Sequence, residues 1–252
     1  MARVHAHSKT ESIVSETPGY RPLYRQVYDI VVHRVAQGVW RPGEALPSEQ
    51  SLARELGVSQ GTMRKVLDAL TAKKVLDRRQ GKGTFIAQST QERTQFRFFR
   101  LARPGGERLA PALATESARV RAARATERER LGLARNARVV EISRVRLIEG
   151  TPAIREHIVL PAAMFTGIEK QMPLPNSLYT LYQSAFGVTI VATHEELTAA
   201  RATAEDHTEL GIDADSPILV IDRIAIGLTD RKVEWRMSRI SCGNLVYAIT
   251  LT

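Results

Sequence analysis

The segment GVSQGTMRKVLDAL, residues 57–70, joins an apolar helical face to a polar first turn. Its apolar residues recur at the spacing of one helix face: Met63, Val66, Leu67 and Leu70. The front end carries Gln60, Thr62 and Arg64. These types can read DNA base edges, because Gln pairs with adenine, Arg with guanine and the Thr methyl group contacts thymine. The alternative is an ordinary solvated helix face.

A second group of charged residues lies on two predicted strands, VVEISRVRLI and AIREHIVL. Arg144 and Arg146 share one strand face with apolar residues, and Glu156 does the same on the next strand. Buried charges must be paired. If Gly150–Pro152 forms the hairpin loop, Arg146 lies opposite Glu156 as a salt bridge. Arg144 is then left over, and two arginines on one strand suit a carboxylate or phosphate ligand.

The elements around residues 57–70 predict a helix-turn-helix followed by a β-wing. A first helix runs from Leu23 to about Gln37, and Ser48 can cap a short second helix, EQSLARELG. Ser59 can cap the third helix, which is expected to end near Lys73 or Lys74. Two strand-like runs, VLDRR and TFIAQ, are joined by QGKG, whose glycines permit a tight hairpin turn.

The charge distribution indicates a polyanion as the first candidate partner of this segment. Residues 1–90 carry 14 Lys and Arg against 8 Asp and Glu, whereas residues 91–252 carry 22 against 19. Candidates for phosphate contacts surround the predicted third helix and the wing: Lys65, Lys73, Lys74, Arg78, Arg79 and Lys82. Among these, Arg79 and Lys82 at the wing are the first choices. Solubility charge is the alternative.

Length and composition predict a two-domain globular protein of the cytoplasm. The chain has 252 residues, of which 43% are hydrophobic and 25% charged. A single cysteine, Cys242, fits a reducing compartment. No apolar run approaches the roughly 20 residues of a membrane span, so no membrane partner is expected. Residues 1–18 are expected to form a disordered polar tail without a signal peptide.

The polar run QSTQERTQ separates two parts of the chain. We therefore predict a domain over residues 19–88, a linker over 89–95 and a second domain over 96–252. The second part alternates predicted strands with short helices, which favours an α+β fold with a mostly antiparallel sheet. Its predicted helices are TERERLGL and SLYTLYQSAF. Its further predicted strands are FRFFRLARPGGERL, GVTIVATHEELTAA, PILVIDRIAIG, KVEWRMSRIS and NLVYAITLT.

Residues 22–87 resemble the winged helix-turn-helix of GntR-family transcription regulators. The motifs that carry the resemblance are PLY, GVWRPGEALPSE, LARELGVS, TMRKVLDAL and RRQGKGTF. The resemblance implies that Arg64 contacts operator bases and that Gly81, at the wing tip, enters the minor groove. Gln50 and Gln60 stand where the family usually has Arg, so the operator sequence or the affinity is expected to differ from the family norm.

The residues expected to contact double-stranded operator DNA lie in the second helix, the third helix and the wing. They are Ser48, Gln50, Ser59, Gln60, Gly61, Thr62, Arg64, Lys65, Arg79, Gln80, Gly81 and Lys82.

Residues 93–250 resemble the UTRA effector-binding domain of one GntR branch, the HutC/UTRA branch, whose fold is like that of chorismate lyase. The carrying motifs are SRVRLIEGTPAIREHIVLP, SLYTLYQSAFGVTI, ATAEDHTELGIDADSPILVIDRIAI and RKVEW. The resemblance implies an effector pocket lined by Arg144, Arg146, Glu156, Ser177, Tyr179 and Glu234. Ile240 stands where a pocket Tyr is usual, and the first strand lacks the Ser of the sugar-phosphate binders. The expected effector is a small anion, an organic acid or a phosphorylated metabolite. Because of these two departures, a small organic acid or an imidazole acid is expected at least as much as an amino-sugar phosphate.

Alternatives remain open for three of these residues: helix capping for Ser177, core packing for Tyr179 and a solvated charge for Glu234. Four of the six histidines, His33, His157, His194 and His207, show no metal-ligand spacing, and neither a metal nor a cofactor is expected.

These observations predict a homodimeric, ligand-responsive transcription regulator, a repressor by family resemblance, and not an enzyme. One alternative is a DNA-binding dimer whose second domain is purely structural. Another is an enzyme of the lyase type, which fold similarity alone supports weakly.

Overall fold

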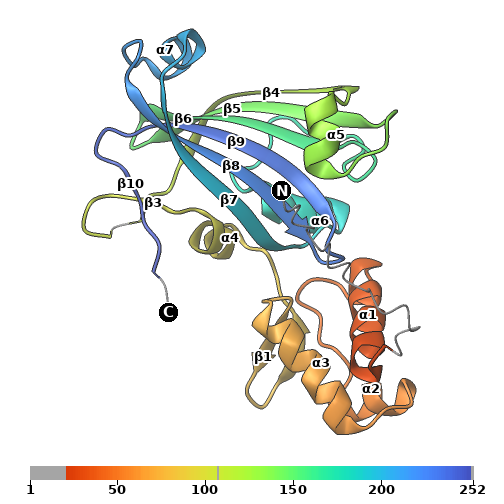
Figure 1. Cartoon of the computed structure of the whole chain (residues 1–252). Helices are drawn as coiled ribbons and strands as arrows, with labels where there is room; N and C mark the ends of the chain where they lie inside the picture. The colour runs from red at the N-terminus through yellow and green to blue at the C-terminus, as the bar shows by residue number, and fades with distance from the viewer. Residues whose placement is uncertain (1–20, 107, 251–252) are drawn as a thin grey trace, which may run out of the picture.

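The computed structural model describes residues 21–106 and 108–250, so the tail predicted over residues 1–18 lies outside the described residues. The chain forms a helical part and a sheet part joined by a single connection near helix α4 (Figure 1). This arrangement matches the predicted fold class of a winged helix-turn-helix followed by an α+β sheet domain. No helix among the described residues has the length and apolar character needed to span a membrane.

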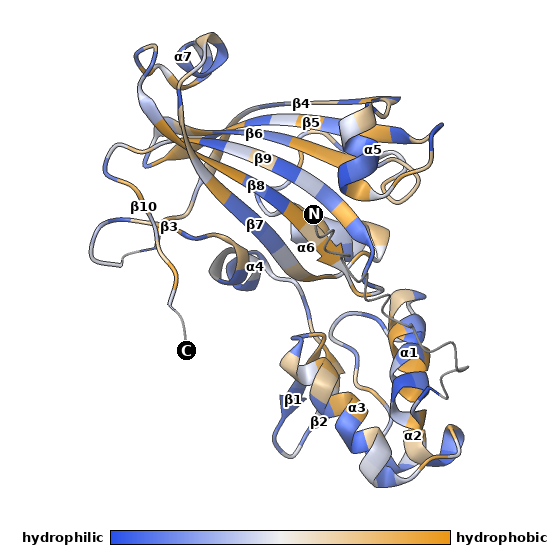
Figure 2. Cartoon of the chain, in the orientation of Figure 1, coloured by the Kyte–Doolittle hydropathy of each residue, from blue (hydrophilic) through white to orange (hydrophobic). Residues whose placement is uncertain are grey.

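The helical part consists of three helices and a β-hairpin. Their bounds are α1 (Leu23–Ala36), α2 (Glu49–Glu55), α3 (Gln60–Ala72), β1 (Leu76–Arg79) and β2 (Gly83–Ile86). The apolar stripe of α3 predicted from the sequence is buried against α1, α2 and the hairpin. Together these elements form one hydrophobic core. Figure 2 shows that α1 and α3 each carry one apolar and one polar face. The predicted helix-turn-helix and wing are therefore confirmed.

Two serines define where α2 and α3 begin. Ser48 Oγ accepts a hydrogen bond of 3.1 Å from the Ser51 N–H, and Ser59 Oγ accepts one of 3.1 Å from the Thr62 N–H. Each bond satisfies a backbone donor that has no partner within its helix. Both serines are N-caps, as predicted, and the cap at Ser59 fixes the polar front end of α3 in space.

The sheet part is built on a six-stranded antiparallel sheet of order β4-β5-β6-β9-β8-β7. The strands are β4 (Ala112–Ala122), β5 (Arg138–Ile148), β6 (Thr151–Pro161), β7 (Ile190–Arg201), β8 (Pro217–Gly227) and β9 (Lys232–Ser241). Helices α4 (Gln91–Phe98) and α6 (Leu178–Phe186) lie on one face, as Figure 1 shows. The remaining elements are α5 (Ala125–Leu131), η1 (Ile168–Lys170), α7 (Ala204–Leu210) and a two-stranded ribbon of β3 (Leu101–Ala102) and β10 (Val246–Tyr247).

Several elements differ from the sequence-based expectations. Helix α4 occupies the segment predicted as linker and the beginning of a strand, and β3 keeps only two residues of that strand. Strand β4 was not predicted at all, because as an edge strand it is half exposed and its alternation is weak. The predicted last strand is reduced to β10.

The predicted hairpin register between β5 and β6 was wrong. The turn is Glu149–Gly150 rather than Gly150–Pro152, and a bulge follows Arg146. As a result Glu156 lies opposite Arg144. Arg146 is the diagonal neighbour of Glu156, a distance that a long side chain spans easily.

Replacing Ser59 with Ala should destabilise α3, because the Thr62 N–H loses its acceptor. We expect a loss of about 1 kcal/mol in the free energy of unfolding. The measurement is urea denaturation followed by circular dichroism. Ser51→Ala is the matched control, since the Ser51 residue is exposed and contributes only its backbone N–H to the cap of α2. Equal midpoints for the two variants would contradict the capping role.

Candidate functional site

The polar front end of α3 forms an exposed surface together with the wing. Gln60, Gly61, Arg64 and Lys65 are exposed, and Thr62 is half-buried with its Oγ1 2.9 Å from Ser59 Oγ. Each polar side chain in the first turn of α3 thus either points outward or supports the N-terminal cap. The residues of this turn that were predicted to contact DNA are therefore not part of the hydrophobic core.

Glu49 of α2, which the sequence analysis missed, positions two arginines on this surface. Its carboxylate accepts hydrogen bonds from Arg64 Nε at 3.1 Å and from Arg78 Nη2 at 3.0 Å. Arg78 also pairs with Asp68 at 2.7 Å. The arginines are 58% and 41% exposed, so these pairs are weak and can exchange for a stronger anion.

The wing presents a basic tip on a glycine turn. Gly81 has φ +69°, a left-handed conformation that disfavours other residues, and no heavy atom lies within 4 Å of the position where a Cβ would stand. The Arg79 guanidinium stacks on the Phe85 ring at 4.1 Å, while Gln80 and Lys82 are exposed. Ser48 and Gln50 are exposed at the start of α2, within the same helix-turn-helix.

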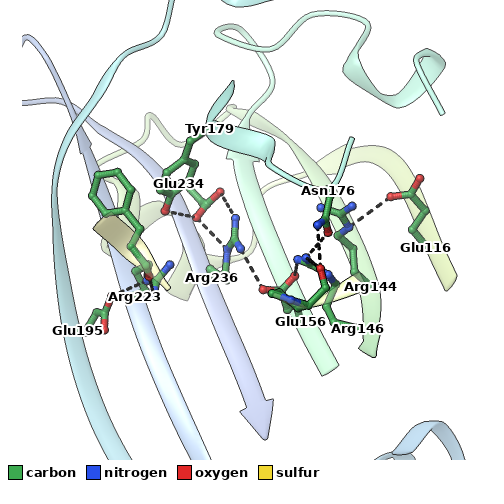
Figure 3. Close-up of polar contacts among 12 residues, drawn as sticks. Glu116, Arg144, Arg146, Glu156, Asn176, Tyr179, Glu195, Arg223, Glu234 and Arg236 are labelled. Carbon is green, nitrogen blue, oxygen red and sulfur yellow. Dashed lines mark hydrogen bonds and ion pairs between the residues drawn. The ribbon is translucent and has the colours of Figure 1, made fainter. Parts of the chain in front are cut away.

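A row of charged side chains crosses the sheet on the face that α4 and α6 cover. We call it the charge row, and every strand of the sheet contributes: Glu116, Arg144, Arg146, Glu156, Arg236, Glu234, Arg223 and Glu195 (Figure 3). The four arginines and four glutamates cancel in charge. Most of them are buried. The free energy lost on removing these charges from water is offset because each lies beside an opposite charge.

Arg236 connects the centre of the charge row. Its Nη1 donates to Glu156 at 3.0 Å, and its Nε and Nη2 donate to the two oxygens of Glu234 at 3.0 and 2.9 Å. Tyr179 and Tyr182 donate their hydroxyls to Glu234 at 3.0 and 2.8 Å. Glu234 is therefore a buried and fully bonded carboxylate rather than a solvated charge.

The two arginines of β5 have different surroundings. Arg146 pairs with Glu156 at 3.3 Å, as the sequence predicted, and also bonds to Asn176. Arg144 is not left over: it lies 3.3 Å from Glu116 of β4 and donates to the Pro175 carbonyl at 3.0 Å. Because β4 was not predicted, its carboxylate could not be counted as a partner.

A pocket opens between the charge row and helices α4 and α6. Of the six residues predicted to line it, Arg146, Glu156, Ser177 and Tyr179 do so. Arg144 and Glu234 are not among the lining residues, and Glu234 lies behind Tyr179 and Arg236. The Ser177 side chain makes no cap bond to α6 and instead contacts Thr180 Oγ1 at 2.9 Å.

Four arginines line this pocket, but only one of its described lining residues is acidic. The arginines are Arg100, Arg146, Arg223 and Arg236, and the acid is Glu156. The carboxylates that balance them, such as Glu234 and Glu195, lie behind the arginines. The wall that faces the cavity is therefore basic and suits an anion.

The sequence analysis missed Arg223, Arg236 and Asn176. Arg236 had a signal, because it alternates with Glu234 on one strand face around Trp235. The strand PILVIDRIAIG is apolar except for the adjacent Asp222 and Arg223, so no repeating pattern pointed to Arg223. Asn176 lies in a loop and reaches the pocket only through the tertiary fold.

The charge row shifts the proton affinities of its members. Burial alone raises the pKa of Glu156, but Arg236, Arg146 and Arg144 outweigh it and lower that pKa to about 2. Burial lowers the pKa of Arg236, yet Glu234 and Glu156 raise it well above its ordinary value. Burial and Glu234 both raise the pKa of Tyr179. Glu156 and Arg236 therefore keep their ordinary charges at neutral pH.

Helix α4 touches the pocket, the sheet and the helix-turn-helix. Its Thr94 and Phe98 line the pocket, and the Phe98 carbonyl accepts a hydrogen bond of 2.7 Å from Arg223. Its Arg97 donates to the Lys73 carbonyl, at the C-terminal cap of α3, at 3.2 Å, and to the Val191 carbonyl of β7. One short helix thus connects the pocket wall with the end of α3.

A separate cluster on the opposite face of the sheet has the residue types of a metal site. Glu127, Glu141 and His157 offer ligand atoms within 4.8 Å of one another. Arg121 bonds to both carboxylates, at 2.7 Å from Glu127 Oε2 and 2.7 Å from Glu141 Oε1, and Arg119 adds a further bond to Glu141. The carboxylates therefore fasten β4 and α5 to β5 as ion pairs.

Glu156→Gln should strongly destabilise the protein, because Arg146 and Arg236 would keep their charges without their shared partner. We expect a loss of about 3–5 kcal/mol at pH 7. Since the pKa of Glu156 is lowered from 4.5 to about 2, its contribution is complete above about pH 4.5 and disappears as the pH falls towards 2.

The measurement is urea denaturation of both proteins between pH 7 and pH 3. The exposed Glu196→Gln is the control and should change stability by less than about 0.5 kcal/mol. A difference between wild type and Glu156→Gln that stays constant down to pH 3 would contradict the lowered pKa.

Comparisons with known proteins agree with both parts of the structure. Residues 23–86 match the family of bacterial regulatory proteins named gntR, and residues 107–241 match the UTRA domain. The chain is similar to the mannosyl-D-glycerate transport/metabolism system repressor MngR of Escherichia coli strain K12. The identity is 29%, over 92% of this chain and 96% of that protein.

A second relative is the HTH-type transcriptional regulator SmoD of Agrobacterium fabrum. It is 30% identical over 79% of this chain and 78% of that protein. Among solved structures, the ligand-binding domain of a GntR-family regulator from Bordetella bronchiseptica aligns with a TM-score of 0.56 at 30% identity. The alignment covers 62% of this chain and 98% of that one. The chain therefore belongs to the GntR family of bacterial transcription regulators, in the branch that carries a UTRA domain.

Proposed function

We propose that this regulator is a repressor that binds operator DNA as a homodimer and is released by a small anionic effector. The two activities follow the predicted domains: residues 19–88 bind DNA, residues 96–252 bind the effector, and residues 89–95, which reach into the first part of α4, link them. The observation that carries the effector is the basic pocket wall, in which Arg146, Arg223 and Arg236 line the cavity beside the one acidic described lining residue, Glu156, while Glu195 and Glu234 lie behind.

The DNA contacts follow from the exposed front end of α3. Gln60, Thr62 and Arg64 enter the major groove, and the wing tip around Gly81 lies on the neighbouring minor groove. Arg64 exchanges its weak pair with Glu49 for a guanine. Two copies read two half-sites about 34 Å apart, which is why we propose a homodimer. A protein that binds the bacterial chromosome acts in the cytoplasm.

The effector acts through α4. An anion in the pocket competes for Arg223, which otherwise holds the Phe98 carbonyl at the end of α4. Movement of α4 shifts Arg97, whose hydrogen bonds tie the end of α3 to β7. Effector and operator then prefer different positions of the helix-turn-helix, so each weakens the binding of the other.

We propose no enzymatic activity for the pocket. A general base works best with a pKa near the operating pH. The pKa of Glu156 is lowered to about 2, and that of Tyr179 is raised by burial. These shifts leave Glu156 a poor base and Tyr179 a poor acid at neutral pH, whereas they suit fixed charges and donors that hold a ligand.

Arg64→Ala should weaken binding to specific DNA by about 1–3 kcal/mol and relax the preference at one base pair. The measurement is fluorescence anisotropy on a duplex that the wild type selects from a random-sequence library. Arg135→Ala, an exposed arginine in the turn before β5, removes the same charge far from the helix-turn-helix and should have little effect. Equal losses in both variants would refute the recognition role of Arg64.

Arg97→Ala should uncouple the two sites while leaving each able to bind its own ligand. In the wild type, a saturating anion that stabilises the protein should lower operator affinity by a coupling energy of about 1–3 kcal/mol. In the variant this energy should fall close to zero. Glu92→Ala, an exposed residue of the same helix, is the control. An unchanged coupling energy in Arg97→Ala would contradict the route through α4.

A further inference from the structure

The effector pocket has an apolar end as well as a basic wall. Ile154 of β6, Ile221 of β8 and Ile240 of β9 line it, together with Leu101 and Phe99. All five belong to one hydrophobic cluster beside the charge row. Ile154 and Ile240 lie opposite each other, two residues along their strands from Glu156 and Ser238. Ile154 is also the direct cross-strand partner of Arg146, so the apolar end adjoins the basic wall.

The segments that close this end lie outside the matched UTRA region, residues 107–241. Strand β10 pairs with β3, and the Ala248 N–H donates to the Arg100 carbonyl at 2.9 Å. Tyr247 of β10 lines the pocket, packs on the apolar cluster and bonds through its hydroxyl to Glu195. Glu195 in turn pairs with Arg223 at 2.7 Å. The ring of Tyr247 thus lies at the apolar end of the pocket, while its hydroxyl is hydrogen-bonded to Glu195.

We propose that the effector is an amphiphilic acid: an anionic headgroup on the arginines and a compact apolar body against the isoleucines and Tyr247. This rests on the proposed anion site and names its ligand class. A polyhydroxylated sugar derivative would place hydroxyls against Ile154, Ile221 and Ile240, where they would lose water without gaining a hydrogen bond. The apolar end therefore selects against such ligands.

The test uses the full chain and two pairs of probes. Hexanoate and gluconate share a six-carbon chain and a carboxylate but differ in hydroxyl groups, and phenylacetate and glucose 6-phosphate extend the comparison. Binding is measured by titration calorimetry and by the shift in melting temperature. We expect hexanoate and phenylacetate to bind and to raise the melting temperature, and gluconate and glucose 6-phosphate to bind at least tenfold more weakly, a difference of about 1.4 kcal/mol.

Variants of Tyr247 locate the apolar body. Tyr247→Ala removes the ring and should weaken phenylacetate binding about tenfold, whereas Tyr247→Phe keeps the ring and should bind it like the wild type. Ile240→Thr and Ile240→Val form a second pair that differs by one hydroxyl for a methyl group, and only Ile240→Thr should weaken phenylacetate binding. The melting temperature of each variant without ligand shows that it is folded.

Three outcomes would overturn the inference. Preferential binding of gluconate or glucose 6-phosphate would refute the amphiphilic class while leaving the anion site intact. Equal phenylacetate affinity in Tyr247→Ala and Tyr247→Phe would place the apolar body elsewhere. Binding of none of the four probes at millimolar concentration would contradict the anion site itself, and the inference with it.

Discussion

Charges buried in a protein sheet must be paired, and this requirement organises the C-terminal half of the chain. The charge row takes at least one residue from each of the six strands, and each of its arginines lies beside a glutamate of the row. Since removing one member leaves another charge uncompensated, the row ties the strands into one register. It also fixes the pocket, because Arg146 and Arg236 are held in place before any ligand arrives.

The two candidate sites use arginine in opposite ways. Arg64 on α3 is exposed and loosely paired with Glu49, which leaves it able to exchange one anion for another in a salt-dependent manner. Arg236 is buried and bonded to two carboxylates, so it is rigid and poorly screened by salt. The first arrangement suits reversible scanning of a polyanion, and the second suits a preorganised pocket. Helix α4 lies between them and contacts both parts.

The fold was largely predictable where local patterns carry the information. The stripe of Met63 and Val66, the caps at Ser48 and Ser59 and the glycine turn of the wing are local signals, and the structure confirms the elements that they predicted. Strand β4 and helix α4 escaped prediction because their stability comes from neighbours: β4 from its ladder with β5, and α4 from contacts such as the hydrogen bonds of Arg97. Missing β4 also produced the wrong assignment of Arg144.

The sequence by itself determined that this chain has a winged helix-turn-helix and an exposed polar front end on α3, and that Arg146 and Glu156 each share a strand face with apolar residues. Spacing of three or four residues in helices and of two residues in strands decides which side chains share a face. Only the tertiary structure decided that Arg144 lies beside Glu116, that Arg223 and Arg236 line the pocket, and that Tyr247 closes it. These contacts join strands far apart in the sequence, and partners across a sheet depend on strand order and register, which no local pattern specifies.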